Sequence, residues 1–316
     1  MADVTTGILR RYARSKTANM KFLDNDAGEA NGAIAGGAGV TRVPLYAHVP
    51  FCKSLCPFCS FNRYLFREGV AREYYALMSR ELEMYAGLGY SFSSINIGGG
   101  TPTVLVDELA LFIDRARSLF GKCSVTVEST PQEITDDSIA VLRSAGVSRL
   151  SIGVQSFDSG MLSSMGRSGY TGNTALERIA IAKGKFDTVG IDMMFNFPSQ
   201  TFESVATDLE AVKSCGADQV TYYPLMPGPN KRTAVEKKFS ERIAGGAVGS
   251  KSERAFYSII TKSLIGAGYV PDSVWTFSRQ RGEIGEYLAD SSEYIGVGAS
   301  SISVMEGMTY LTSSHH

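Results

Sequence analysis

The chain has 316 residues, of which 44% are hydrophobic and 20% charged, with a formal net charge of −1. This composition is ordinary for a soluble globular protein. The balanced charge argues against nucleic acid or an anionic membrane as the main partner, and no apolar stretch reaches the length of a membrane span. The N-terminus lacks a signal-peptide pattern. The chain has five cysteines, an odd number that cannot all pair in disulfides within the chain, which favours a reducing compartment. We therefore expect a cytoplasmic protein.

Residues 1–40 are predicted to be an N-terminal extension that is partly flexible, because residues 28–39 are rich in Gly and Ala. From residue 41 onward, strand-like runs alternate with segments of helical periodicity. The predicted strands are Val43–Val49, Ser94–Ile97, Ser124–Glu128, Arg149–Val154, Thr188–Phe195 and Gln219–Tyr223, and the predicted helices are Ala71–Ala86, Val106–Phe120, Thr135–Ala145, Thr174–Lys183 and Phe202–Ser214.

Six strands that alternate with helices predict an α/β protein built from βαβ units with a parallel sheet. We expect a partial (β/α)6 TIM-type barrel over residues 41–230. An open, doubly wound sheet is the alternative, which periodicity alone does not exclude.

The alternation ends after residue 223, where three prolines follow within six residues. A charged, exposed segment is expected at Lys231–Arg242, then a helix at Ser252–Ile265, an extended segment at Tyr269–Phe277 and a glycine-rich apolar block at Tyr294–Ser303. Residues 231–316 are thus predicted to form a short C-terminal appendage.

Three of the five cysteines, Cys52, Cys56 and Cys59, lie in one loop directly after the first predicted strand. Thiolates this close together can bind one soft metal centre. A structural zinc ion would need a fourth protein ligand, and no second Cys/His cluster follows. Three cysteines instead suit a [4Fe–4S] cluster with one iron left open to another ligand, since four cysteines are the usual set. Cys123 and Cys215 are predicted to be core residues.

Ligands of parallel α/β sheets bind at the carboxyl ends of the strands, and reactive or flexible residues gather there in this sequence. They are Gly98, Gly99, Gly100 and Thr101 after the second strand, Glu128, Gln155, Asp192 and Tyr222/Tyr223 at the next four strand ends, and Arg167 after a short helix. The glycines either lie along a small zwitterion or form a tight turn. Glu128 either accepts hydrogen bonds from a ribose diol or caps a helix, and Asp192 either binds a ligand or forms a structural salt bridge.

Aromatic and imidazole groups surround the cysteine loop. Tyr46 and His48 alternate on one face of the first strand, and the histidine is either a satisfied core residue or a functional group. Phe58, inside the loop, is expected to shield a cluster or to stack near an adenine.

The Cys-x-x-x-Cys-x-x-Cys pattern after a strand resembles the radical S-adenosylmethionine (SAM) enzymes. The wider pattern resembles the oxygen-independent coproporphyrinogen III oxidase family, which includes the oxidase, heme chaperones, anaerobic heme-degrading enzymes and class C radical SAM methyltransferases. The stretches that carry this resemblance are Tyr46–Cys59, Gly98–Thr103, Glu128, Ser151–Phe157, Gly166–Arg167, Ile191–Asp192, Pro198–Thr201 and Tyr294–Ser301.

The resemblance implies a role for each matching residue. Cys52, Cys56 and Cys59 would hold the [4Fe–4S] cluster and, with Tyr46 and His48, form the catalytic set. A first SAM would contact Gly99, Gly100, Glu128, Arg167 and Asp192, with Tyr46 and Phe58 near it, and Thr101 and Gln155 would face a second SAM.

Three departures separate this chain from particular family members. Phe61 stands where the true oxidase has a further cysteine, and the oxidase's N-terminal part is not recognisable in residues 1–40. The His-Asn-x-x-Tyr-Trp signature of the heme chaperones is absent. The pattern is therefore closest to the class C methyltransferases or the heme-utilising members.

The resemblance implies reductive cleavage of SAM to a 5′-deoxyadenosyl radical and methyl transfer from a second SAM to an sp² carbon of an aromatic or heteroaromatic substrate. The alternatives are porphyrin chemistry, either anaerobic heme ring opening or oxidative decarboxylation, and a non-enzymatic role in heme trafficking. The expected partners are a planar aromatic or tetrapyrrole molecule and a flavodoxin- or ferredoxin-type electron donor. We expect a monomer.

Overall fold

The computed structural model describes residues 42–198, 200–226, 237, 241, 250–280, 291–305 and 307–312. The predicted N-terminal extension and most of the charged segment Lys231–Arg242 lie outside these ranges, as do both predicted domain boundaries. The six main strands are β1 (Arg42–Val49), β4 (Ser91–Gly99), β5 (Ser124–Ser129), β6 (Arg149–Gln155), β7 (Thr188–Phe195) and β8 (Gln219–Pro224).

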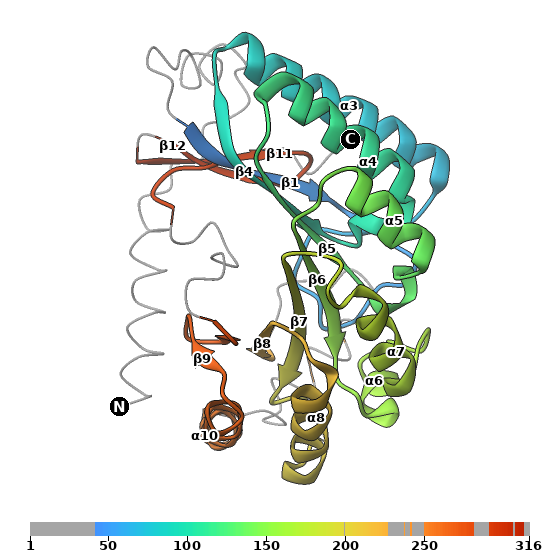
Figure 1. The fold of residues 1–316 in the computed structure, drawn as a ribbon, viewed down its shortest axis with the longest axis vertical. Coiled ribbons are helices and arrows are strands. Elements are labelled where there is room, and N and C mark those ends of the chain that lie inside the picture. The colour runs from blue at the N-terminus through green and yellow to red at the C-terminus, as the bar shows by residue number, and fades with distance from the viewer. Residues whose placement is uncertain are drawn as a thin grey trace.

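These six strands are parallel, and each pairs with the next one along the chain. A doubly wound sheet reverses its strand order at a switch point, and no reversal occurs here. The strands follow a curved path from β1 to β8 (Figure 1). The partial barrel is confirmed, and the doubly wound alternative is excluded.

Helices cover one side of this curved sheet (Figure 1). They are α3 (Glu68–Gly87), α4 (Val106–Phe120), α5 (Asp136–Ser144), α6 (Ser159–Ser164), α7 (Gly172–Ala182) and α8 (Phe202–Cys215), and α10 (Ser250–Gly266) packs beside α8. Helix α3 shows why the sequence folds this way, since its buried residues, Ala71, Tyr74, Tyr75, Met78, Leu82 and Tyr85, follow helical spacing. None of the described helices is both long and apolar enough to cross a bilayer.

The strands alternate between the core and the inside of the barrel. In β1, Val43, Leu45, Ala47 and Val49 are at most 3% exposed and belong to the main core. Side chains of successive strand residues point to opposite faces, so the residues between them face inward. This alternation brings polar residues of several strands to one side of the sheet.

Short C-terminal strands extend both edges of the sheet. β11 (Ile295–Val297) pairs in parallel with β1, while β10 (Thr276–Ser278) pairs antiparallel with β8 and with β9 (Val270–Pro271). The sequence predicted an extended segment for β9 and β10 but no strand for the glycine block that contains β11. β12 (Ile302–Met305) and β13 (Met308–Leu311) form a separate hairpin.

Asp208 of α8 holds the turn that follows β6. Its side chain is 1% exposed and accepts hydrogen bonds from the Ser156 hydroxyl at 3.0 Å and from the Phe157 N–H at 2.6 Å. Burial raises the pKa of Asp208 to about 6, and these hydrogen bonds offset the increase only in part. The turn positions Gln155, whose φ of 72° departs from the strand.

We expect the stability of the protein to depend on pH through Asp208. Because its pKa is higher in the folded state, folding takes up a proton, and this stabilisation is lost as the pH rises through about 6. Relative to Asp208→Asn, the wild-type free energy of unfolding should rise by about 1 kcal/mol between about pH 7 and about pH 5. Urea unfolding of both proteins measures this difference.

The matched control is Asp107→Asn, at an exposed aspartate in the first turn of α4. Its difference from the wild type should stay constant with pH. A constant difference for Asp208→Asn as well would contradict the assignment.

Candidate functional site

A cavity of about 760 Å³ lies at the carboxyl ends of the parallel strands. The cysteine loop and the ends of β4, β5, β6 and β7 contribute to it, and β8 and the β9–β10 turn also line it. All predicted site residues except Tyr46 and His48 line this cavity: Cys52, Cys56, Phe58, Cys59, Gly99, Gly100, Thr101, Glu128, Gln155, Arg167 and Asp192.

The cysteine loop is closed at its base by two short strands, β2 (Phe51–Cys52) and β3 (Tyr64–Leu65). Within the loop, the Cys59 N–H donates to the Cys56 carbonyl at 3.2 Å, and the buried Arg63 guanidinium donates to the same carbonyl. These contacts turn all three thiols toward one cavity. The chain's five cysteines are all described and form no disulfide.

The environment of Cys52 and Cys59 disfavours ionisation of their thiols without a metal. Burial raises the pKa of Cys52 to about 11, although the Thr101 hydroxyl, 3.7 Å from its Sγ, opposes the increase. Burial also raises the pKa of Cys59, against the opposing charge of Arg63. A coordinated metal deprotonates a thiol outright, so these groups suit metal ligation better than service as isolated nucleophiles.

The residues present fit an iron–sulfur cluster better than a single metal ion. Within the described ranges, no three His, Cys, Asp or Glu side chains converge on one metal position. The thiolates of a cluster bind different irons and need no such convergence. The hydroxyl of Thr101 adds a hydrogen bond to one sulfur, which is a contact that tunes such clusters.

The glycine run after β4 packs against its surroundings without room for side chains. A Cβ on Gly98 would lie 2.6 Å from the Glu128 carboxyl group, and Gly99 has a φ of 114° that favours glycine. The Gly99 N–H donates to Glu128 Oε2 at 3.1 Å, and the next two N–H groups donate to the carbonyl of Val49, the last residue of β1, and to the carbonyl of Phe51 in β2. These three N–H groups therefore already donate hydrogen bonds within the protein. The glycine run can help a ligand to bind chiefly because it has no side chains to fill the space beside it.

Tyr46 and His48 lie behind the glycine run and not in the cavity lining. The Tyr46 hydroxyl is 3.0 Å from His48 Nδ1, and His48 Nε2 is 2.9 Å from the Asn62 carbonyl oxygen. Burial lowers the pKa of His48, so the ring is neutral. The sequence left His48 either as a satisfied core residue or as a functional group, and these two hydrogen bonds agree with the first of these. The predicted catalytic roles of Tyr46 and His48, and a place for Tyr46 near SAM, stay predictions. The His48 ring packs against Gly99, where an added Cβ would lie 2.6 Å from it.

The charged groups of the cavity are held by neighbouring elements. Asp192 accepts a hydrogen bond from the Ser151 hydroxyl at 3.2 Å, and Arg167 donates to the Gly153 carbonyl at 2.8 Å. Arg167 also interacts electrostatically with Cys56 and Cys59, which places its charge beside the cysteine loop. A positive and two negative side chains thus line the space next to the thiols, as a zwitterionic ligand requires.

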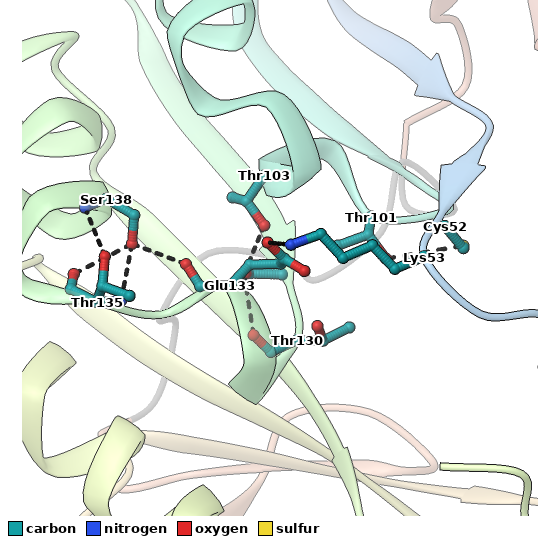
Figure 2. A network of polar contacts seen from close by, with 9 residues as sticks. Cys52, Lys53, Thr101, Thr103, Thr130, Glu133, Thr135 and Ser138 are labelled. Atoms are coloured by element: carbon teal, nitrogen blue, oxygen red, sulfur yellow. Dashed lines mark hydrogen bonds and ion pairs between the residues drawn. The ribbon is translucent and has the colours of Figure 1, made fainter. Parts of the chain in front are cut away.

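Sequence reasoning missed the ion pair between Lys53 and Glu133, with 2.8 Å between Lys53 Nζ and Glu133 Oε2. Figure 2 shows Lys53 reaching from the cysteine loop to Glu133 of the 3₁₀ turn Pro131–Glu133. The Glu133 carbonyl accepts a hydrogen bond from Ser138, within the N-terminal cap of α5. The pair ties the cysteine loop to the β5–α5 connection, and no motif in the sequence indicated it.

The wall opposite the cysteine loop contains Tyr223 and Trp275, but not Tyr222. Tyr222 is 0% exposed and belongs to the main core, because adjacent strand residues face opposite sides. Of the two tyrosines that the sequence placed at this strand end, only Tyr223 lines the cavity.

A model of the radical SAM superfamily matches residues 46–212. The chain is 27% identical over 265 residues to the heme chaperone HemW of Bacillus subtilis, covering 80% of this chain and 69% of that protein. It is 27% identical over 195 residues to HemW of Buchnera aphidicola, covering 60% of this chain and 52%, about half, of that protein. The structure of coproporphyrinogen III oxidase (HemN) from Escherichia coli has a TM-score of 0.78 at 23% identity, covering 91% of this chain and 70% of that one.

The HemN likeness supports the fold, and the family model covers the strands that build the cavity from the cysteine loop to Asp192. A radical SAM domain implies a [4Fe–4S] cluster and SAM, which agrees with the thiols and charged groups of the cavity. The chain belongs to the radical SAM superfamily and is similar to its HemW/HemN-like members.

Proposed function

We propose that the protein is an enzyme that reductively cleaves SAM at a [4Fe–4S] cluster held by Cys52, Cys56 and Cys59. The observation that carries this proposal is the shared cavity of the three thiols with Glu128, Arg167 and Asp192. When bound, the cluster and SAM supply a 5′-deoxyadenosyl radical, which is chemistry of the cofactors. A flavodoxin- or ferredoxin-type protein is the proposed electron donor.

The protein's own residues bind and orient SAM. In this proposal, Arg167 pairs with the SAM carboxylate, Asp192 accepts from its amino group, and Glu128 accepts from the ribose hydroxyls. Gly99 and Gly100 leave space beside the thiols, and Phe58 covers the loop with its ring against Phe197 at 6.1 Å.

For the reaction, we propose methyl transfer from a second SAM to an sp² carbon of a planar aromatic or heteroaromatic substrate. The volume of about 760 Å³ lies in the upper half of the usual range for ligand pockets, roughly 300–1,000 Å³. Thr101 and Gln155 line this space. Porphyrin chemistry, by ring opening or oxidative decarboxylation, is the alternative for the same radical.

A non-enzymatic role in heme trafficking is the second candidate, since several relatives are named heme chaperone HemW. Within the described ranges the sole histidine is His48, and both of its ring nitrogens are already in hydrogen bonds. The described residues therefore offer heme iron no histidine.

We also propose a cytoplasmic location, which suits five cysteines that form no disulfide.

Anaerobic reconstitution of the cluster, followed by assay with SAM and dithionite, tests this proposal. We expect 5′-deoxyadenosine, and S-adenosylhomocysteine alongside it if methyl transfer is correct. Cys56→Ala should lose the cluster absorbance and the product, while Cys123→Ala, outside the cavity lining, should retain both. Absence of 5′-deoxyadenosine from the wild type would contradict the enzyme, and an intact cluster in Cys56→Ala would contradict the ligand set.

Gly99→Ala tests the role of the glycine run. The new Cβ would lie 2.6 Å from the His48 ring on a backbone with φ of 114°, so the glycine run or the ring must shift and the cavity wall at Gly99 changes shape. We expect the dissociation constant for SAM, measured by equilibrium dialysis, to rise by about tenfold or more.

Gly87→Ala is the control, because Gly87 lies at the end of α3 with no atom within 4 Å of the added Cβ. Iron content should stay unchanged in both variants. Wild-type SAM affinity in Gly99→Ala would show that this run does not shape the site.

A further inference from the structure

One wall of the cavity has no role in the proposed binding of SAM. Tyr223 at the end of β8 and Trp275 at the start of β10 line it, with 6.0 Å between their ring centroids and 64° between their planes. β8 and β10 lie at the far side of the sheet from β1, which precedes the cysteine loop. The two rings therefore face the site from the side opposite the thiols.

The turn that carries Trp275 is held in place from several directions. The Trp275 carbonyl accepts from the Tyr222 N–H at 2.9 Å, and the Asp272 N–H donates to the Thr276 carbonyl at 3.0 Å. From α10, the Tyr257 hydroxyl donates to the Val274 carbonyl at 2.5 Å. Trp275 is thus preorganised, so a ligand need not order the turn when it binds.

The surface beside the two rings is apolar and open to the cavity. Val274 is 50% exposed and Met226 is 53% exposed, and both line the cavity. The indole N–H of Trp275 has no hydrogen-bond partner among the described residues. Because the two rings are tilted by 64°, a flat ring system would stack on one of them and meet the other edge-on, and it could also offer an acceptor to this N–H.

The charges of the cavity are divided between its two sides. Its described cationic residues are all engaged near the cysteine loop: Lys53 with Glu133, Arg63 with the Cys56 carbonyl, and Arg167 with the Gly153 carbonyl. On the opposite wall, the turn carries the exposed Asp272, which forms no ion pair with any described residue. The charge of Asp272 therefore attracts cationic groups, repels carboxylates and leaves neutral rings unaffected.

We propose that Tyr223 and Trp275 form the platform for the substrate ring and that Asp272 selects neutral or cationic heteroaromatic rings over polycarboxylates. The inference rests on the proposed function, which left two substrate classes open, heteroaromatic rings and porphyrins. The charge of Asp272 favours the first of these classes. Tetrapyrroles with several propionates are disfavoured, and compact nitrogen heterocycles are favoured.

Trp275 is the single tryptophan of the chain, so its fluorescence reports directly on this wall. The test titrates the reconstituted, SAM-loaded protein with two probes of equal ring size, 9-aminoacridine as the cation and acridine-9-carboxylate as the anion. We expect saturable quenching by the cation and binding of the anion weaker by about tenfold, which is the effect of about 1.4 kcal/mol. Equal or tighter binding of the anion would overturn the charge selection.

Variants separate the rings from the charge, with probe fluorescence anisotropy as the readout. Trp275→Ala should weaken binding of 9-aminoacridine by about tenfold, and Trp275→Phe should restore most of it. Asp272→Asn should remove the preference between the probes, while the control Asp107→Asn, outside the cavity, should keep it. Unchanged binding in Trp275→Ala would overturn the platform.

This binding test needs no SAM cleavage, so the two proposals fail separately. If the probes bind as expected but no 5′-deoxyadenosine forms, the proposed reaction is wrong and the platform stands. If 5′-deoxyadenosine forms but neither probe binds, the platform is wrong and the reaction stands.

Discussion

The close packing of the loop after β4 against the loop after β1 is the constraint on which the site depends. The N–H groups of Gly100 and Thr101 donate to the carbonyls of Val49 and Phe51, each at 2.8 Å. A Cβ on Gly100 would lie 2.7 Å from the Phe51 carbonyl oxygen, so only glycine permits this approach. The same contact brings the Thr101 hydroxyl to the sulfur of Cys52. Two strand ends thereby become one wall of the cavity.

The chain order of the strands supplies the rest of the site. Because the six main strands, β1, β4, β5, β6, β7 and β8, are parallel and neighbours in this order, their carboxyl ends meet on one side, and alternation turns every second residue inward. Glu128, Gln155 and Asp192 therefore line one cavity although they are far apart in the sequence. The buried Asp208 adds a support from outside, since it fixes the turn behind Gln155.

Local patterns predicted most of this arrangement and failed where distant segments meet. The cysteine spacing and the strand ends are local signals, so the cavity residues from Cys52 to Asp192 could be anticipated. The position of His48 could not be anticipated. Alternation along β1 predicts that His48 points into the barrel, but only the packing of its ring against Gly99 places it behind the glycine run. β11 has three residues, which is too short for periodicity. Trp275 reaches the cavity because β10, directly after it, pairs antiparallel with β8, where Thr276 and its partner Thr221 are 55 residues apart.

The division of the cavity into a charged side and an aromatic side bears on how a radical enzyme controls its reaction. A carbon radical abstracts whichever hydrogen lies within reach, so selectivity comes from position and from the exclusion of other groups. In the proposed function, the charged side would hold a zwitterion by ionic contacts that fix its orientation, and the aromatic side would hold the substrate ring. Phe61 is 53% exposed and lines the cavity. It stands at the position where the resemblance to the oxidase family places a further cysteine in the oxidase.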